Sequence, residues 1–463
     1  MSLKHSFFLL IVAIIIKFLA LIYTNLDLFG DEAQYWLWSK NLDLGYYSKP
    51  PLLAWVLGGF NYFVGNSFVA IKLVPFVFYF LTSYLIYLLS LELFNNKKLA
   101  VFTALTFYLM PAVSVSSFLV STDVVLVFFW CLSLLFLLKI RKNKSLNNFF
   151  LLGIFLGLSF LAKYAAVYFL LSFFIFLFVD NATRKIFLKN IVGFLIFVFS
   201  AVVVVMPNIF WNINNNWVTF SHTSENAGLN RANLNFLQGI EFILLQGIML
   251  GPLVFFAFFV YVKKIKFDFQ TKFLTSFSLP IFLIVFVESI LVRANANWAA
   301  VALIAFFLLI VNHVYIFSKK ILIYNNFVNF VFCSVLFFLI GASSPVSFLD
   351  RISGISAFAK ALESNHLQDK NVLVVEDRLL YSNLKYIFRN KDFSILTPHD
   401  PGSEIKSHFQ ISDPLKNDFN NNFLFLGNVE NINYLSAKHR VRFVEKKNVK
   451  FRALPIKIYE VVF

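Results

Sequence analysis

Residues 149–180 read FFLLGIFLGLSFLAKYAAVYFLLSFFIFLFVD, and this stretch decides the fold. The run is almost wholly apolar, but it is longer than the roughly 17–25 residues that a helix needs to span a bilayer. Lys163 interrupts it near the middle. We therefore predict two short helices, at 149–162 and 164–180, which meet at Lys163.

The composition of the whole chain agrees with a membrane protein. The chain has 463 residues, of which 59% are hydrophobic and 14% are charged, and its mean hydropathy is +0.75. Soluble domains carry about 25% charged residues, so this chain has too few to cover a water-facing surface. A purely soluble enzyme and a disordered protein are both excluded, and we predict a polytopic integral membrane protein.

Nine further apolar runs have the length of a membrane span, which gives about eleven transmembrane helices in total. These runs are 6–23, 68–94, 99–116, 122–138, 190–210, 236–262, 272–292, 297–317 and 324–342.

The basic residues orient these spans. The formal net charge of +16 could indicate a nucleic-acid partner, but most of the excess lies in short loops between apolar runs. If the N-terminus is cytoplasmic, the inner loops carry 14 Lys and Arg and the outer loops only five. The positive-inside rule then places the C-terminal segment on the outer face. We predict no nucleic-acid partner.

The composition changes near Pro345, after which charges are frequent and no run could span a bilayer. We predict a transmembrane domain at 1–344, with a long first outer loop at 24–67, and a small α/β domain at 345–463. Within this domain we expect a helix at 378–389. The expected strands are 372–376, 423–426 and 456–462. The two cysteines, Cys131 and Cys333, lie in apolar runs and offer no disulfide framework.

The first outer loop contains several candidate functional residues. It includes F29-G-D-E-A-Q-Y-W-L-W-S39 and then G45-Y-Y-S-K-P-P-L52. Asp31 could simply cap a helix, and the apolar residues 52–64 suit an interfacial helix. The loop supplies the candidates Asp31, Glu32, Tyr46, Tyr47 and Lys49.

Other segments bring further polar residues to the same predicted face. Alone, each has a structural explanation: Asp123 could complement a helix dipole, Lys163 could reach the headgroups, and His222 could be a solvated loop residue. Together, these acids and cations indicate a reaction at the outer surface, with carboxylates that activate a nucleophile and cations that hold an anion. The candidates from these segments are Asp123, Lys163, His222, Glu225, Arg293, Asn297 and Trp298.

These motifs, in this order, resemble the GT-C glycosyltransferases. The resemblance is closest to the bacterial branch related to protein O-mannosyltransferases and lipid A aminoarabinose transferases. It rests on the D31-E32 pair, G45-Y-Y-S-K-P-P-L52, S121-T-D123, the G157-L-S-F-L-A-K163 junction and N297-W298.

The resemblance implies an inner-membrane enzyme that moves a sugar from a polyprenyl-phosphate donor to an acceptor at the periplasmic face, with inversion at the anomeric carbon. The acceptor could be lipid A, another envelope glycan or a protein. By the same resemblance, Asp31 matches the catalytic acidic residue, with Glu32 beside it, and Asp123 matches the second acidic position. Lys49 matches the lysine that approaches the lipid phosphate, and the other candidates for donor binding are Lys163, Arg293 and His222.

One position departs from the aminoarabinose branch. An acidic residue commonly precedes the lysine of the K-P-P motif there and can help to hold a divalent ion, whereas this chain has Ser48. The departure argues against a metal ion at that position and against the aminosugar assignment. His222 and Glu225 leave a divalent cation as an alternative, and we assign no metal ligand.

Two other classes of function compete with a transferase. A flippase or transporter for lipid-linked sugars predicts charges near the centres of spans and pseudo-symmetric halves, and neither is visible. A silent scaffold for envelope enzymes predicts that loss of the Asp31 carboxylate leaves the cell's glycans unchanged.

Overall fold

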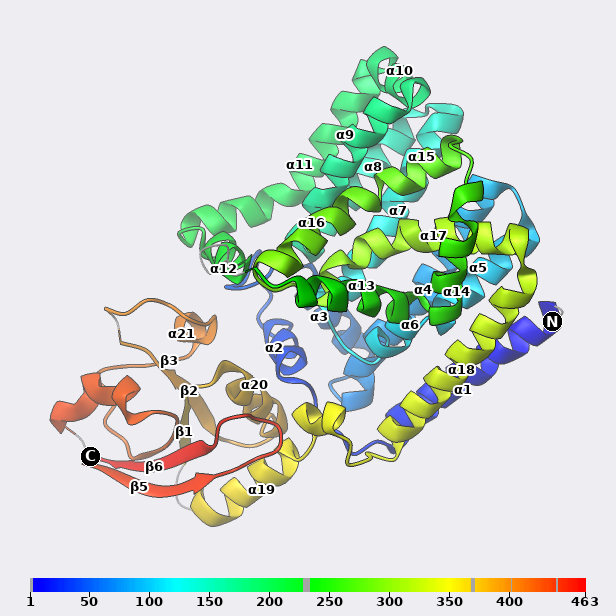
Figure 1. Ribbon diagram of the computed structural model, residues 1–463. Helices are drawn as coiled ribbons and strands as arrows, with labels where there is room; N and C mark the ends of the chain where they lie inside the picture. The colour runs from blue at the N-terminus through cyan, green and yellow to red at the C-terminus, as the bar shows by residue number, and fades with distance from the viewer. Residues whose placement is uncertain (1–2, 228–233, 368–370, 401, 439) are drawn as a thin grey trace. The chain divides into compact units, whose positions relative to one another are not determined.

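The computed structural model describes residues 3–227, 234–367, 371–400, 402–438 and 440–463 (Figure 1). These residues form two compact units. The first, which we call the membrane unit, comprises Met1–Leu19, Lys49–Leu53 and Lys72–Phe338. The second, which we call the sheet unit, comprises Ala20–Ser48, Ala54–Ile71 and Leu339–Phe463.

The helices that lie wholly or mainly in the membrane unit are rich in apolar residues. By length and composition, six of the described helices can cross a membrane, or up to eight if each of two bent pairs is one span. The α-helices are α1 (Leu3–Tyr23), α4 (Phe68–Phe94), α5 (Lys97–Leu109), α6 (Pro111–Ser116), α7 (Thr122–Asn143), α8 (Leu146–Ala162), α9 (Val167–Val179), α10 (Asn181–Lys189), α11 (Ile191–Asn214), α12 (Val218–Ala227), α13 (Phe236–Leu250), α14 (Pro252–Tyr261), α15 (Phe269–Ser276), α16 (Leu279–Leu291), α17 (Ala300–Phe317) and α18 (Lys319–Gly341). The short 3-10 helices are η1 (Tyr164–Ala166), η3 (Val262–Lys264) and η4 (Ala296–Ala299).

The break predicted at Lys163 is confirmed. Helix α8 ends at Ala162, and Lys163 has an extended backbone with φ −162° and ψ 135°. The turn η1 follows and leads into α9. One residue in the extended region ends the run of helical hydrogen bonds and gives the chain a new direction.

The run 236–262, which the sequence predicts as one span, is not one continuous helix. The chain there forms two helices, α13 and α14, that are bent by 107° at Gly251. Gly251 has φ +107°, which a residue with a side chain rarely adopts, and Pro252 then begins α14 without needing a backbone donor. The run 99–116 is also divided, because Pro111 begins α6. The total of eleven spans stays a prediction.

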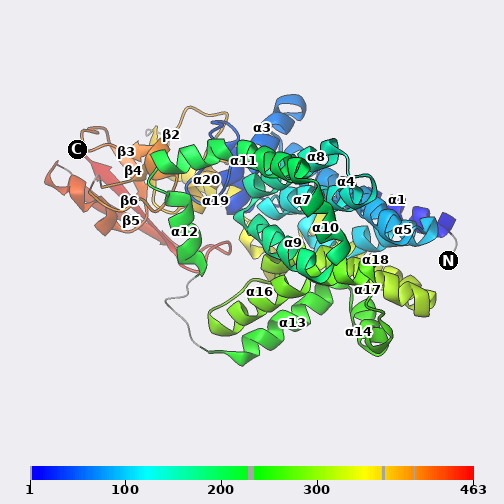
Figure 2. The ribbon, with the colours of Figure 1, turned by 90° about the horizontal axis from the view of Figure 1, so that it is seen from above.

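Close packing within the membrane unit depends on small residues. Helix α8 packs against α7 on one side and α11 on the other (Figure 2). A Cβ atom added to Gly153 would lie 2.3 Å from the Phe197 carbonyl oxygen of α11. Small residues let membrane helices approach this closely.

A separate apolar cluster in the membrane unit contains Ala13, Leu105, Tyr108 and Leu109, and Phe330 of α18 packs against it.

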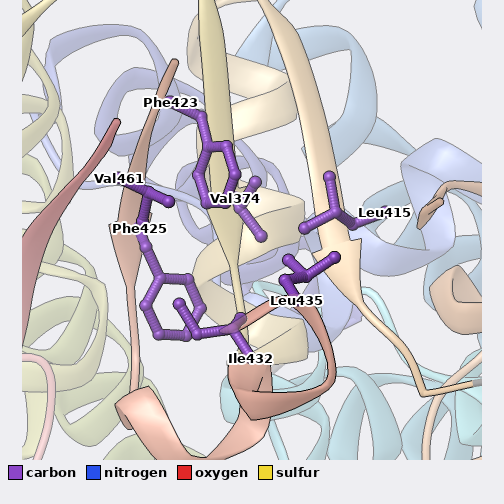
Figure 3. Packing of buried hydrophobic residues seen from close by; sticks show 7 residues of the cluster. All are labelled: Val374, Leu415, Phe423, Phe425, Ile432, Leu435 and Val461. Atoms are coloured by element: carbon purple, nitrogen blue, oxygen red, sulfur yellow. The ribbon is translucent and has the colours of Figure 1, made fainter. Parts of the chain in front are cut away.

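The sheet unit contains one six-stranded mixed sheet. Its strand order is β3-β2-β1-β4-β6-β5, in which β1 pairs parallel with β2 and β4, and β6 pairs antiparallel with β4 and β5. Phe423 and Phe425 of β4 and Val374 of β1 belong to its apolar core (Figure 3). The strands are β1 (Val372–Val375), β2 (Ser394–Pro398), β3 (Pro414–Leu415), β4 (Phe423–Leu426), β5 (Arg440–Lys447) and β6 (Ile456–Val462). The helices that lie wholly or mainly in this unit are α2 (Gly30–Trp38), α3 (Leu52–Val64), η5 (Ser347–Ile352), α19 (Ile355–His366), α20 (Arg378–Ile387), α21 (Phe409–Ser412) and η6 (Val429–Lys438).

The sequence predicted part of this sheet. The helix at 378–389 and the strands at 372–376, 423–426 and 456–462 are confirmed as α20, β1, β4 and β6. The strands β2, β3 and β5 were missed. Strand β5 reads RVRFVEKK and is mostly exposed, so it lacks the apolar run that marks a buried strand.

Helix α2 of the first loop packs against helix α20 within the sheet unit. Trp36 of α2 meets Tyr386 of α20 edge to face at 5.0 Å. A Cβ atom added to Gly30 would lie 2.5 Å from the Leu379 Cβ. The approach of α2 to α20 therefore requires glycine at position 30.

We expect Gly30→Ala to lower the melting temperature, because overpacking a close contact costs about 1–3 kcal/mol. A thermal unfolding scan of the purified protein in detergent measures this effect. Gly59→Ala is the matched control, since no atom lies within 4 Å of its added Cβ and alanine favours the helix. Equal melting temperatures for Gly30→Ala and Gly59→Ala would contradict the packing.

Candidate active site

Three predicted residues meet in the membrane unit. Asp123 lies in the first turn of α7, Lys163 follows the last residue of α8, and Asn297 lies in η4. The Lys163 Nζ lies 2.7 Å from the Asp123 Oδ1, and the Asn297 Nδ2 donates to the Asp123 Oδ2 at 2.8 Å. The Asp123 and Lys163 side chains are only 10% and 20% exposed. The structure therefore joins three distant segments at one carboxylate.

The pairing changes what Lys163 can do. Part of its charge is balanced by Asp123, so it is less available to a phosphate group than the sequence alone indicates. A paired ammonium and an amide donor fix the direction of both carboxylate oxygens. We infer that Lys163 and Asn297 orient Asp123.

Two buried lysines that were not among the predicted candidates support the same region. The Lys17 Nζ donates to the Ser117 Oγ at 3.0 Å, and the Lys72 Nζ donates to the Phe118 carbonyl oxygen at 3.0 Å. Both lysine side chains are fully buried. They fix the turn between α6 and α7 that precedes Asp123. A lysine inside an apolar run is itself a signal of function, and this signal could have found both.

Arg293 lines a small cavity in the membrane unit. The cavity has a volume of about 270 Å³ and lies between α13 and the segment that joins α16 to η4. Glu241 and Asn295 line it as well. The backbone N–H of Trp298 donates to the Asn295 carbonyl oxygen at 3.0 Å. The lining therefore contains one guanidinium group and one carboxylate.

His222 and Glu225 lie on helix α12, so the explanation of His222 as a loop residue is wrong. A turn with positive φ at Asn216 and Trp217 ends the preceding segment and lets the new helix begin at Val218. Glu225 is exposed and His222 is half-buried. In the part of the chain that the structure describes, no three or more His, Cys, Asp or Glu side chains are grouped to hold a metal ion.

Asp31 lies in the sheet unit, in the first turn of α2. Glu32, rather than Asp31, caps the helix, because the Glu32 Oε2 accepts the Phe29 N–H at 2.8 Å. The alternative reading of Asp31 as the cap is therefore wrong. Asp31 is 38% exposed, and its Oδ1 lies 3.2 Å from the Arg378 Nη1. Its other carboxylate oxygen accepts no hydrogen bond from the described residues of the sheet unit.

Arg378 is a functional candidate that the sequence did not reveal. It is the first residue of α20, and its Nη1 also donates to the Gln34 Oε1 at 2.6 Å. Arg378 therefore connects two polar side chains of α2 to the C-terminal sheet. A guanidinium fixes the direction of a carboxylate while leaving part of it open.

Tyr46 is part of a buried aromatic cluster rather than an open surface. Its ring stacks on Trp38 at 4.5 Å, and its hydroxyl donates to the Trp38 carbonyl oxygen at 3.0 Å. Burial raises the pKa of Tyr46 to about 12. The neighbouring candidates Tyr47 and Lys49 are both half-buried. Tyr46 therefore stabilises the conformation of the first outer loop.

His408 adds a pH dependence to this cluster. Its ring packs edge to face against Trp38 and Tyr46, and burial lowers its pKa to about 4, partly offset by Asp43 and Asp413. In the unfolded chain the His408 imidazole binds a proton near pH 6.5, whereas in the folded chain it does so only near pH 4. The contribution of His408 to stability is therefore fully present above pH 6.5 and is lost as the pH falls from 6.5 to 4.

We expect the melting temperature of the wild type to fall across this window, as followed by tryptophan fluorescence between pH 7.5 and 4.5. The variant His408→Phe should show a flatter profile, because it keeps an aromatic ring but cannot bind a proton. Parallel profiles for the two proteins would exclude His408 as the cause.

The chain is similar in sequence to known glycosyltransferases. The family described as dolichyl-phosphate-mannose-protein mannosyltransferase matches residues 48–211. A relative from Rhizobium johnstonii, the lipid A galacturonosyltransferase RgtD, is 31% identical over 415 residues, which cover 86% of each chain. The undecaprenyl phosphate-alpha-4-amino-4-deoxy-L-arabinose arabinosyl transferase of Wigglesworthia glossinidia brevipalpis is 27% identical over 181 residues, which cover 35% of this chain and 32% of the relative.

The fold is shared with solved structures of ArnT from Cupriavidus metallidurans. The apo structure superposes with a TM-score of 0.67 at 11% identity and covers 99% of this chain and 98% of that chain. The structure bound to undecaprenyl phosphate gives the same score at 13% identity, with the same coverage. At this identity the likeness shows the fold alone. The extensive similarity to the 31% identical relative shows that the chain belongs to the GT-C superfamily of membrane glycosyltransferases, in the bacterial branch related to protein O-mannosyltransferases and lipid A aminoarabinose transferases.

Proposed function

We propose that this glycosyltransferase moves a sugar from a polyprenyl-phosphate donor to lipid A, with inversion at the anomeric carbon. The observation that carries the proposal is the 31% identity with a lipid A galacturonosyltransferase along 86% of both chains. The 27% identical relative is named for an undecaprenyl-phosphate sugar donor, which supports the donor class. Another envelope glycan or a protein is the alternative acceptor.

The reaction is a direct displacement. The oxygen of an acceptor hydroxyl attacks the anomeric carbon, the bond from that carbon to the phosphate oxygen breaks, and the phosphate leaves with the electron pair. A carboxylate takes the hydroxyl proton. Because the leaving phosphate is already a stable anion, cations that balance its growing charge matter more than a strong acid.

We assign these tasks to particular residues. Asp31 is the proposed base, since one of its oxygens is directed by Arg378 and the side chain is partly exposed. Lys49 and Arg293 are the proposed phosphate ligands. Asp123, oriented by Lys163 and Asn297, is proposed to bind donor hydroxyls.

The proposed location is the periplasmic side of the bacterial inner membrane. The support is the contrast between 14 positive residues in the predicted inner loops and five in the outer loops. Alkaline phosphatase fused after Phe463 should be active, because that enzyme folds only outside the cytoplasm. An inactive fusion, together with an active cytoplasmic reporter at the same position, would overturn the orientation.

The proposed chemistry can be tested with purified protein in proteoliposomes. The assay supplies polyprenyl-phosphate galacturonic acid first, because of the relative's sugar, and lipid A as acceptor. Mass spectrometry should detect one added sugar, and NMR should show an inverted anomeric configuration relative to the donor. A product with retained configuration would exclude direct displacement. If the protein moves the donor from one leaflet to the other but transfers no sugar, the result would favour a flippase.

A further inference from the structure

The sheet unit contains a large polar cavity outside the residues assigned above to the reaction. Its volume is about 860 Å³, within the range of roughly 300–1,000 Å³ that ligand sites occupy. It is lined by the residues that directly follow three parallel strands: Glu376 after β1, His399 after β2 and Gly427 after β4. We call it the carboxyl-edge cavity.

The topology of the sheet explains why a cavity forms at this edge. Strand β1 lies between β2 and β4, and all three run parallel. The chain leaves β1 for β2 on one side and later returns to β4 on the other. Connections that depart in opposite directions open a crevice at the carboxyl ends of the strands, where α/β sheets bind ligands.

The walls of the cavity are held in place by their own contacts. The two Glu376 carboxylate oxygens accept the Asn428 N–H at 2.6 Å and the Asn431 Nδ2 at 2.7 Å. Asp377 pairs with Arg452 at 3.0 Å and also caps α20. These contacts join the segments after β1 and β4 to the one before β6. The cavity is therefore a built feature of the fold.

The lining groups match a ligand with many hydroxyls better than a phosphate. The lining contains five carboxylates and four Lys or Arg side chains, so the charges nearly cancel, and several are already paired inside the protein. A phosphate site instead concentrates cations. The remaining lining includes the amide residue Asn433, which is exposed. Amides donate and accept hydrogen bonds, as sugar hydroxyls require.

One residue connects the cavity to the proposed base. Arg378 lines the cavity and donates to both Asp31 and Gln34 of α2. A saccharide held in the cavity would therefore lie beside the guanidinium that directs Asp31.

We propose that the carboxyl-edge cavity binds sugar residues of the acceptor through their hydroxyl groups. This inference rests on the proposed function, because it takes the acceptor to be a glycolipid. It deepens that function by assigning acceptor recognition to the C-terminal sheet.

Binding and transfer are measured separately to test the proposal. Deacylated lipid A, with and without its phosphates, is titrated into the full-length protein in detergent, and tryptophan fluorescence gives Kd. The variant Asn433→Trp, which fills the cavity, should weaken binding at least 10-fold and raise the acceptor KM equally, with kcat and the donor KM unchanged. Asn421→Trp is the matched control, because Asn421 is exposed in the same unit but does not line the cavity.

Each outcome decides the proposal. Equal affinity for the phosphorylated and phosphate-free forms, lost in Asn433→Trp and kept in Asn421→Trp, supports a saccharide site. Binding only of the phosphorylated form, or an unchanged Kd in Asn433→Trp, overturns it. If the wild type transfers no sugar but binds the deacylated saccharide at this cavity, the proposed function fails and the site remains. Should Asn433→Trp not fold, Asn433→Ala tests the site by removing the amide instead of filling the cavity, and it should also weaken binding.

Discussion

Replacing Asp31 with asparagine is expected to lower the rate of sugar transfer by roughly 10²–10⁴-fold, the usual contribution of a positioned base. The amide has nearly the shape of the carboxylate and can still accept a hydrogen bond from Arg378, so the fold should persist. What is lost is the group that takes the acceptor's proton. Initial rates with saturating donor, measured in proteoliposomes, give the effect directly.

The matched control for this variant is Asp418→Asn, which removes an exposed carboxylate elsewhere in the sheet unit. Its rate should equal that of the wild type. The melting temperature of Asp31→Asn should stay within a few degrees of the wild type, because the contact with Arg378 is partly exposed and such pairs contribute little. Near-wild-type turnover in Asp31→Asn would remove Asp31 from the reaction.

Breaking the pair between Asp123 and Lys163 is expected to have the second large effect. Each side chain is mostly buried, so removal of one partner leaves an uncompensated charge in a poorly solvated site. Such losses cost about 3 kcal/mol. Both Asp123→Asn and Lys163→Met should therefore unfold at clearly lower temperatures than the wild type.

The double variant separates pairing from simple loss of polarity. Asp123→Asn with Lys163→Met leaves no unpaired charge, so its melting temperature should exceed what the two single losses predict together. It should remain inactive if Asp123 binds the donor. Additive losses in the double-mutant cycle would show that the two side chains act independently, against the 2.7 Å contact.

The parts of the fold that the sequence predicted follow from local patterns. The break at Lys163 could be predicted because a charged residue divides an apolar run that is too long for one span. The bend at Gly251 was missed because the apolar composition continues through it, although the Gly-Pro pair was a local signal of a break. Strand β5 was missed because an exposed edge strand lacks the apolar pattern of a buried one.

The candidate site was likewise predicted only in part. Asp123, Lys163 and Asn297 could each be selected from their motifs and predicted level, but their convergence on one carboxylate depends on tertiary packing. The role of Arg378 could not be predicted, because it and Asp31 lie 347 residues apart and nothing local marks the contact. Lys17 and Lys72 differ, since a lysine inside an apolar run was visible in the sequence and was passed over.

The most direct test of the central proposal is mass spectrometry of lipid A and envelope glycans from three strains. One carries the wild-type gene, one lacks it, and one expresses Asp31→Asn at an equal level. The proposal predicts that one sugar mass on lipid A is present in the first strain and absent from both others. The same sugar on lipid A in all three strains would contradict the proposal, and its loss only in the deletion strain would reject Asp31 as the base.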